Sequence, residues 1–334
     1  MRNVKKDTLN LSEHQIQERL DQKAQRKDRL TSVLPYVGLI FLIVLFCCTT
    51  GGRFQSADNL KSILNQTYTL AIIVLGGSFL YSIGVLDMSI GSVLGVCSLV
   101  IAICVSDLQL PLWLSFLLGM LVAIGCMCIN SAVKIYLRVD PFIGSMCMMN
   151  ICAGIQTSVT ASRKVYFATS DYMFINHVAL KITVLVALFL VGLFLFNHTV
   201  IGKQLKIIGG SPTVAKLSGI NITTMTYVAY IFTGICIVVS AFFLLGRTGS
   251  VEAGTGNGLN LNVLTAVVLG GFPLNGGAGS RFTGPLVGAL TITVLMNGLS
   301  LLGYADVVGY LFKGVLFLIV VGLTYERSKG KLIN

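Results

Sequence analysis

Ten apolar stretches follow one another along the chain after a polar segment of 33 residues. A helix needs about 20 apolar residues to cross the hydrocarbon core of a bilayer, and nine of the stretches approach or reach that length. The pattern therefore predicts an all-α, polytopic membrane protein with about ten transmembrane helices. The stretch 260–273 is short, and we expect it to be partly re-entrant. The predicted ranges are 34–50, 62–82, 88–106, 111–133, 142–160, 179–197, 225–246, 260–273, 284–302 and 305–324.

The apolar stretches divide the chain into a membrane domain, 34–324, and two polar tails, 1–33 and 325–334. The first tail has no short apolar segment after its initial basic residues, so it is not a cleavable signal peptide. Ser12 and Gln15 have the spacing of a capping box, with a weak apolar stripe beyond them. A short amphipathic helix and a disordered tail both remain open for this segment.

Composition excludes an ordinary cytosolic enzyme, because 54% of the residues are hydrophobic and only 11% are charged. The net charge of +11 fits either nucleic-acid binding or basic cytoplasmic loops. No basic stretch is interleaved with stacking aromatic residues, which favours the loops. With the N-terminus inside, 17 Lys and Arg residues fall in inner segments and six in outer ones. This bias predicts that both termini are cytoplasmic.

Residues for catalysis or metal binding are scarce. The nine cysteines all lie in apolar stretches without a C-x-x-C pair, and the three histidines are scattered in predicted loops. No nucleophile and base can be paired, and no phosphate-binding G-x-x-x-x-G-K-[ST] loop is present. We therefore expect no catalytic residue, no metal ligand and no cofactor in this chain.

Two charged residues interrupt the apolar stretches. Asp87 has two compatible interpretations: with Ser89 it caps a helix that starts near Ile90, or it lines or breaks a translocation path. Lys313 either faces such a path or extends its long side chain to a membrane surface. An ion-driven carrier needs more titratable groups than these, so the sequence favours energy from another subunit.

A sequence echo favours an internal repeat over a chance match. Residues 74–79 resemble residues 268–272, and each segment precedes a Gly- and Ser-rich break and a further apolar stretch. Transporters often descend from duplicated bundles. We expect the substrate path to lie where such repeats meet.

The longest inner loop, 198–224, contains signals for a short helix. Ser211 is suited to cap a helix whose first residue is Pro212, and Gly219 is suited to end it. Such a helix between two membrane spans is either a docking element for a partner or a plain surface loop.

Four segments resemble the ribose-type sugar permeases of bacterial ABC importers. They occur in the order of that family and together cover about 50–324. The segments are Ile83-Gly84-Val85-Leu86-Asp87-Met88-Ser89-Ile90-Gly91-Ser92, Arg138-Val139-Asp140-Pro141-Phe142-Ile143, the loop 209–220, and 266–299 with its Gly270-Gly271, Gly276-Gly277 and Asn297-Gly298-Leu299.

The resemblance implies the permease subunit of an ATP-binding-cassette importer for a ribose-like monosaccharide, in a bacterial cytoplasmic membrane. It implies a second permease subunit, identical or related, an extracytoplasmic binding protein, and a cytoplasmic ATPase that binds ATP and Mg. It implies no nucleic-acid partner. The residues that match the family's substrate path are Asp87, Ser89, Gly91 and Asn297, and those that match its ATPase-coupling loop are Gly209, Gly210, Ala215, Gly219 and Ile220.

The chain departs from the family pattern at Val85-Leu86 and at 272–275, which puts the identity of the sugar in doubt. Nucleosides or another small polar solute are therefore open as the cargo. A stand-alone secondary carrier and a membrane-embedded enzyme are disfavoured by the scarcity of titratable and catalytic groups.

Overall fold

The computed structural model describes residues 33, 35–161, 163–167, 172–273, 275–304 and 306–324. The amphipathic helix expected in 1–33 and the tail 325–334 lie outside the described residues, apart from residue 33. Each of the ten predicted apolar stretches contains a helix. Their bounds are Pro35–Thr49, α3 Ala57–Ser82, α4 Ile90–Ser106, α5 Leu112–Tyr136, α6 Pro141–Thr160, α7 Val178–Leu193, α10 Ile222–Thr248, α11 Leu259–Leu269, α12 Gly284–Leu301 and α13 Asp306–Thr324.

Six of these helices are long and apolar enough to cross a membrane: α3, α5, α6, α10, α12, and α7 with its π-helical extension η2 Phe194–His198. Three apolar helices are shorter, namely Pro35–Thr49, α4 and α11. α11 has 11 residues, so it rises only about 16 Å. It cannot span the bilayer alone, in agreement with the short stretch expected at 260–273.

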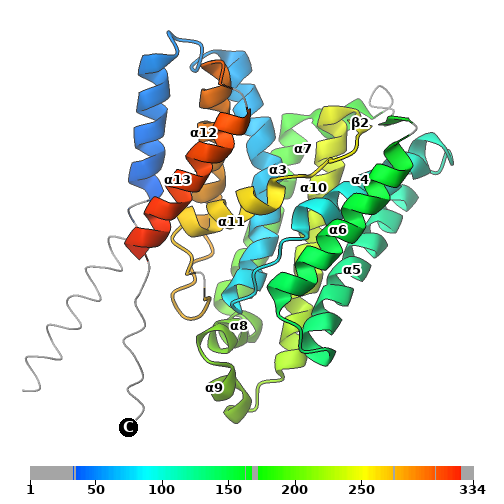
Figure 1. Ribbon diagram of the computed structural model, residues 1–334, viewed down its shortest axis with the longest axis vertical. Helices are drawn as coiled ribbons and strands as arrows, with labels where there is room; N and C mark the ends of the chain where they lie inside the picture. Colours follow the sequence, from blue (N-terminus) through cyan, green and yellow to red (C-terminus); the bar gives the residue numbers. More distant parts are fainter. Residues whose placement is uncertain are drawn as a thin grey trace, which may run out of the picture.

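The helices form a single bundle with α3 near its centre (Figure 1). α10 packs against α3 and α5, while α4 packs against α5 and α6. α11 and α12 pack against each other on the opposite flank, where Pro35–Thr49 and α13 also lie (Figure 1). Side chains of α3, α4 and α10 fill the main core, including Phe79, Leu94 and Ile237, which have no exposed surface.

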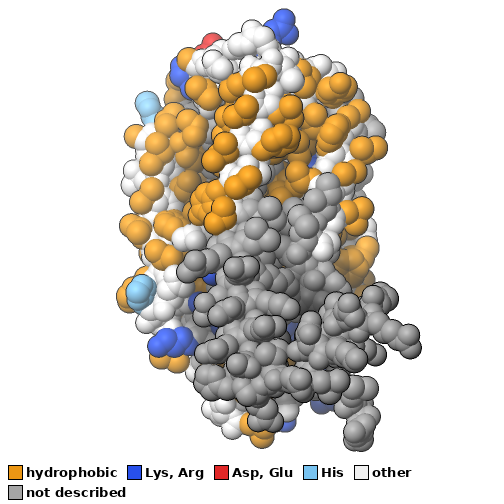
Figure 2. Space-filling model, turned by 90° about the vertical axis from the view of Figure 1, so that its left-hand side faces the viewer, with side chains coloured by type: hydrophobic (Ala, Val, Ile, Leu, Met, Phe, Trp, Pro, Cys, Tyr) orange, Lys and Arg blue, Asp and Glu red, His pale blue; other side chains and the backbone are white. Residues whose placement is uncertain are grey.

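The outer flank of the bundle is apolar. Phe41, Leu311 and Leu318 are each more than 60% exposed there, and Figure 2 shows a broad area of hydrophobic side chains on this face. Exposed apolar surface of this extent is expected where lipid tails, not water, surround a protein. The fold is that of a helical polytopic membrane protein.

The two ends of the bundle differ. At the lower end in Figure 1, the short helices α8 Val200–Gly210 and α9 Pro212–Leu217 connect α7 to α10. At the upper end, β1 Val165–Tyr166 pairs antiparallel with β2 Ser250–Val251, and the 3-10 helix η1 Met173–Asn176 precedes α7.

Candidate functional site

A polar cavity of about 510 Å³ opens between α3, α10, α11 and α12. Helical spacing brings the polar side chains of the cavity together. The polar lining residues of α3 lie three or four positions apart along the chain, as do those of α12, so each group shares one helix face. Within the part of the chain that the structure describes, Arg247 is the one charged residue that lines the cavity. The polar lining residues are Asn59, Ser62, Gln66, Thr69, Arg247, Asn262, Thr293, Asn297 and Ser300.

Hydrogen bonds within the bundle orient the amides of this cavity. Lys313 Nζ donates to Asn262 Oδ1 at 2.8 Å, which leaves the Asn262 NH2 group as a donor toward the cavity. Asn59 Nδ2 donates to the Phe54 carbonyl at 2.9 Å, which leaves its amide oxygen as an acceptor. Asn297 Oδ1 is buried and has no partner among the described residues. The cavity therefore presents both donors and acceptors, and none of the described residues that line it carries a carboxylate.

Lys313 is 6% exposed and points into the bundle toward α11. Of the two interpretations left open by the sequence, the extension to a membrane surface is wrong. Its side chain supports the cavity from behind, because Asn262 lies between Lys313 and the cavity.

Asp87 lies apart from this cavity, in the extended break between α3 and α4. Its Oδ1 accepts from Ser89 N at 2.7 Å and from Ser89 Oγ at 2.6 Å, and its Oδ2 accepts from Asn130 Nδ2 at 3.1 Å. The neighbouring Met88 N donates to Ser145 Oγ at 3.0 Å. Asp87 is 1% exposed. The carboxylate thus joins the break to α5, and Ser145 joins it to α6.

The predicted helix start at Ile90 is confirmed, with Ser89 at the N-cap position. The Ser89 side chain makes no capping bond to the helix, however, and instead donates to Asp87. The Asp87 carboxylate, and not the Ser89 hydroxyl, therefore stabilises the entry to α4, because it accepts from the Ser89 N–H directly ahead of Ile90.

Gly91 lies where a series of turns between β2 and α11 crosses the start of α4. A Cβ at Gly91 would overlap the Gly256 carbonyl, and a Cβ at Gly95 would overlap the Thr255 carbonyl. Gln156 Nε2 donates to Ser92 O at 3.0 Å beside this crossing. The two interrupted segments therefore touch backbone to backbone, which requires glycine at the contact.

At the lower end, the predicted cap is confirmed. Ser211 Oγ accepts from Val214 N at 3.4 Å, Pro212 is the first residue of α9, and Gly219 has φ +74° just after the helix. Ala215 is fully buried, and its carbonyl accepts from Ile220 N at 3.0 Å. The exposed surface of α9 comes from other residues, above all Leu217, which is 84% exposed, and Val214.

The other two glycines assigned to the coupling loop, Gly209 and Gly210, differ in their surroundings. A Cβ at Gly209 would overlap the Ser82 carbonyl, whereas a Cβ at Gly210 would meet nothing within 4 Å. Gly209 therefore faces the bundle and Gly210 faces open space.

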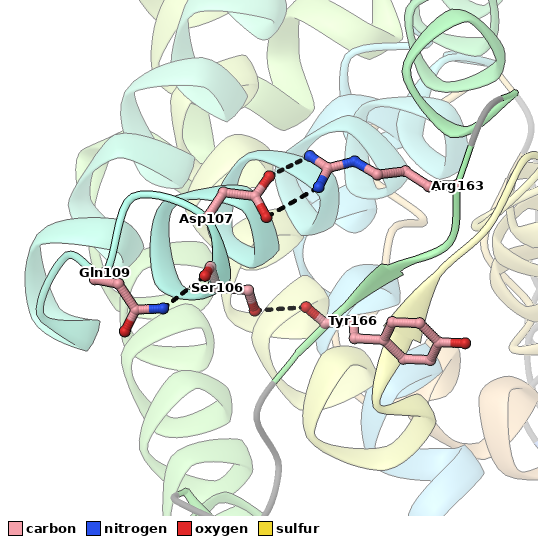
Figure 3. Close-up of polar contacts among 5 residues, drawn as sticks. All are labelled: Ser106, Asp107, Gln109, Arg163 and Tyr166. Atoms are coloured by element: carbon pink, nitrogen blue, oxygen red, sulfur yellow. Dashed lines mark hydrogen bonds and ion pairs between the residues drawn. The ribbon is translucent and has the colours of Figure 1, made fainter.

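The upper end is held by polar contacts between the loop before α7 and its neighbours (Figure 3). Arg163 forms a bidentate ion pair with Asp107, and Ser106 Oγ donates to the Tyr166 carbonyl at 2.6 Å. Lys164 Nζ lies 2.6 Å from Glu252 Oε1. These carboxylates raise the pKa of Arg163 and of Lys164. The contacts tie the α6–α7 connection to the end of α4 and to the segment before α11.

The sequence-predicted residues thus fall in three places. Asp87, Ser89 and Gly91 lie together at the α4 break, Asn297 lines the cavity, and the loop residues lie at the lower end. Among the residues that line the cavity, only Asn297 was predicted from the sequence. The sequence does contain a signal for the cavity, because the polar residues 59, 62, 66 and 69 of α3 are spaced to share one helix face.

Known proteins resemble the chain over most of its length. The family model described as branched-chain amino acid transport system / permease component matches residues 59–321. The fructose import permease protein FrcC of Rhizobium meliloti is 28% identical over 305 residues, which cover 87% of this chain and 84% of the relative. The ribose import permease protein RbsC of Escherichia coli strain K12 is 30% identical over 295 residues, or 85% and 91% of the two chains. No solved structure gives a significant match.

Proposed function

The chain belongs to the family of branched-chain amino acid transport system permease components, and from this premise we propose that it is the membrane-spanning permease subunit of an ATP-driven sugar importer. This family consists of transporter components and not of enzymes. Relatives are named for ribose and fructose import, and a 25% identical relative is the xylose transport system permease protein XylH of Escherichia coli strain K12.

The observation that carries the proposal is the polar cavity in an apolar bundle. Amide and hydroxyl groups hydrogen-bond a neutral, polyhydroxylated solute without the cost of a buried carboxylate. The buried acceptor of Asn297 and the oriented NH2 group of Asn262 are suited to sugar hydroxyls. We assign the cavity and Asn297 to the solute path, and Asp87, Ser89 and Gly91 to the interrupted span that frames it.

We further propose that the end carrying α8 and α9 is cytoplasmic, with both chain termini on the same side. The loop 198–224 carries Lys203, Lys206 and Lys216, as expected for a cytoplasmic loop. The chain then crosses the bilayer ten times. Two of these crossings combine a non-helical segment with a short helix, namely 83–106 and 250–269.

A cytoplasmic ATPase that binds ATP and Mg would dock on α9 and the end of α8. Val214 and Leu217 project from this end, and apolar knobs of this kind fit a groove on a partner protein. In this arrangement Gly209 and Ala215 shape the loop from inside, while Gly210 and Gly219 are exposed and Ile220 is half-buried. The opposite end would receive the extracytoplasmic binding protein, and a second permease subunit would complete the path.

The proposal is tested by purifying the tagged chain from its native membrane in a mild detergent. We expect an ATPase with a phosphate-binding loop to co-purify and the complex to hydrolyse ATP. A chain that is recovered alone, and that supports sugar uptake driven by an ion gradient in vesicles without any ATPase, would identify a secondary carrier instead.

A further inference from the structure

We propose that a contact between three backbone segments, the glycine junction, passes movement of α8 to both interrupted parts of the bundle. The junction consists of Gly209 on α8, Ser82–Gly84 after α3, and Asn275–Gly277 in the connection between α11 and α12. The inference rests on the proposed function, because it concerns how an ATPase on α8 and α9 would act on the solute path.

The three segments touch without side chains between them. Gly277 N donates to the Ser82 carbonyl at 3.0 Å. A Cβ at Gly209 would overlap that same carbonyl and would lie 2.6 Å from Gly277 N. A Cβ at Gly84 would lie 2.9 Å from the Asn275 carbonyl. Each segment is therefore held at backbone distance from the other two.

Such a contact is suited to transmit displacement. A side chain can absorb a small shift by changing its rotamer, whereas close-packed backbone cannot. α8 is also anchored along its length, since Leu205 and Ile208 are buried against the bundle. A shift of α8 therefore displaces Ser82 and Gly277 with it.

Of the two segments beyond the junction, one leads to the interrupted span at Asp87 and the other to the cavity at Asn297. Gly84 has φ +70°, and three residues later Asp87 is bound to Ser89 and Asn130. Gly277 has φ +96° and precedes α12, which carries Asn297. Glycines in this region of φ change conformation at low cost, so they are suited as hinges on either side of the contact.

Two nearby glycines in the connection between α11 and α12 provide a matched test. Gly277→Ala places a methyl group 3.2 Å from the Gly210 Cα, while Gly279→Ala would meet only Pro273 at 3.7 Å. Gly209→Ala, which places a methyl group into the Ser82 carbonyl, is the second junction variant. All three variants are made in the full chain carrying Ser62→Cys, which lines the cavity and is exposed. Each is purified with its ATPase and reconstituted in nanodiscs. Labelling of that cysteine by a charged maleimide is measured by mass spectrometry, with and without ATP and vanadate.

We expect Gly277→Ala to retain the ATPase and ATP hydrolysis but to lose the nucleotide-dependent change in labelling, which Gly279→Ala keeps. Gly209→Ala should lose the same change in labelling. An unaltered labelling change in both junction variants would overturn the inference. So would failure of both to insert while Gly279→Ala inserts, because the junction would then serve folding alone. Absence of an ATPase from the unmodified complex would instead refute the proposed function.

Discussion

Replacing Asp87 by alanine tests whether the carboxylate holds the interrupted span together. Asp87→Ala removes the acceptor of three buried donors, namely the Ser89 N–H, the Ser89 hydroxyl and one N–H of the Asn130 amide. A stranded buried donor costs about 1–3 kcal/mol, so the three together cost about 3–9 kcal/mol. Asp87→Asn should cost less, because its amide oxygen still accepts from Ser89 while its NH2 group opposes that of Asn130.

The assay measures the melting temperature of the detergent-purified chain, by size-exclusion chromatography of samples heated to a series of temperatures. Asp107→Ala is the matched control, because it also removes a carboxylate but from a solvent-exposed pair with Arg163. Exposed ion pairs contribute little to stability, so this control should melt near the unmodified chain. We expect a clear order, with Asp87→Ala lowest and Asp87→Asn between it and the control. An Asp87→Ala protein that melts at the temperature of the control would show that the carboxylate does not hold the interrupted span together. Unchanged sugar uptake by Asp87→Ala would show that Asp87 has no role in transport and only caps the span.

Three further substitutions test the backbone crossing at Gly91, the polar cavity and the docking surface on α9. Gly91→Ala should lower the amount of folded protein in the membrane, because its methyl group meets the Gly256 carbonyl, whereas Gly154→Ala on α6 meets nothing within 4 Å and should not; equal amounts on quantitative blots would contradict the backbone crossing. Asn297→Leu should abolish sugar uptake at a normal membrane level, since it removes a cavity acceptor; uptake with unchanged KM would exclude Asn297 from the path. Leu217→Glu should reduce recovery of the ATPase, whereas Leu108→Glu at the other end should not; equal recovery would place docking elsewhere.

Sequence reasoning located features that depend on neighbouring residues. The start of α4 at Ile90, the Ser211–Pro212 start of α9 and the glycine after α9 are all set by local capping chemistry. The apolar stretches were found for the same reason, because each helix carries its own length and hydropathy. The shortness of the stretch 260–273 was found in the same way, since α11 has only 11 residues; that this segment is partly re-entrant stays a prediction.

Features that depend on contacts between distant segments were not found. Asn130 lies 43 residues from Asp87, and Gly209 lies 127 residues from Ser82, so neither pairing has a local signal. The sequence echo placed a break after 268–272, and the structure brings Gly276 in that break against Gly84 in the first one. The series of turns before α11, which crosses the start of α4, was missed because its glycines resemble those of an ordinary loop.

Sugar uptake into proteoliposomes tests whether this chain is the permease subunit of an ATP-driven sugar importer. The proteoliposomes contain the co-purified complex, with ATP inside and the binding protein outside. We expect that ribose, fructose or xylose accumulates, that uptake needs both ATP and the ATPase, and that an imposed ion gradient does not replace them. Accumulation driven by an ion gradient, with no ATPase present, would contradict this expectation.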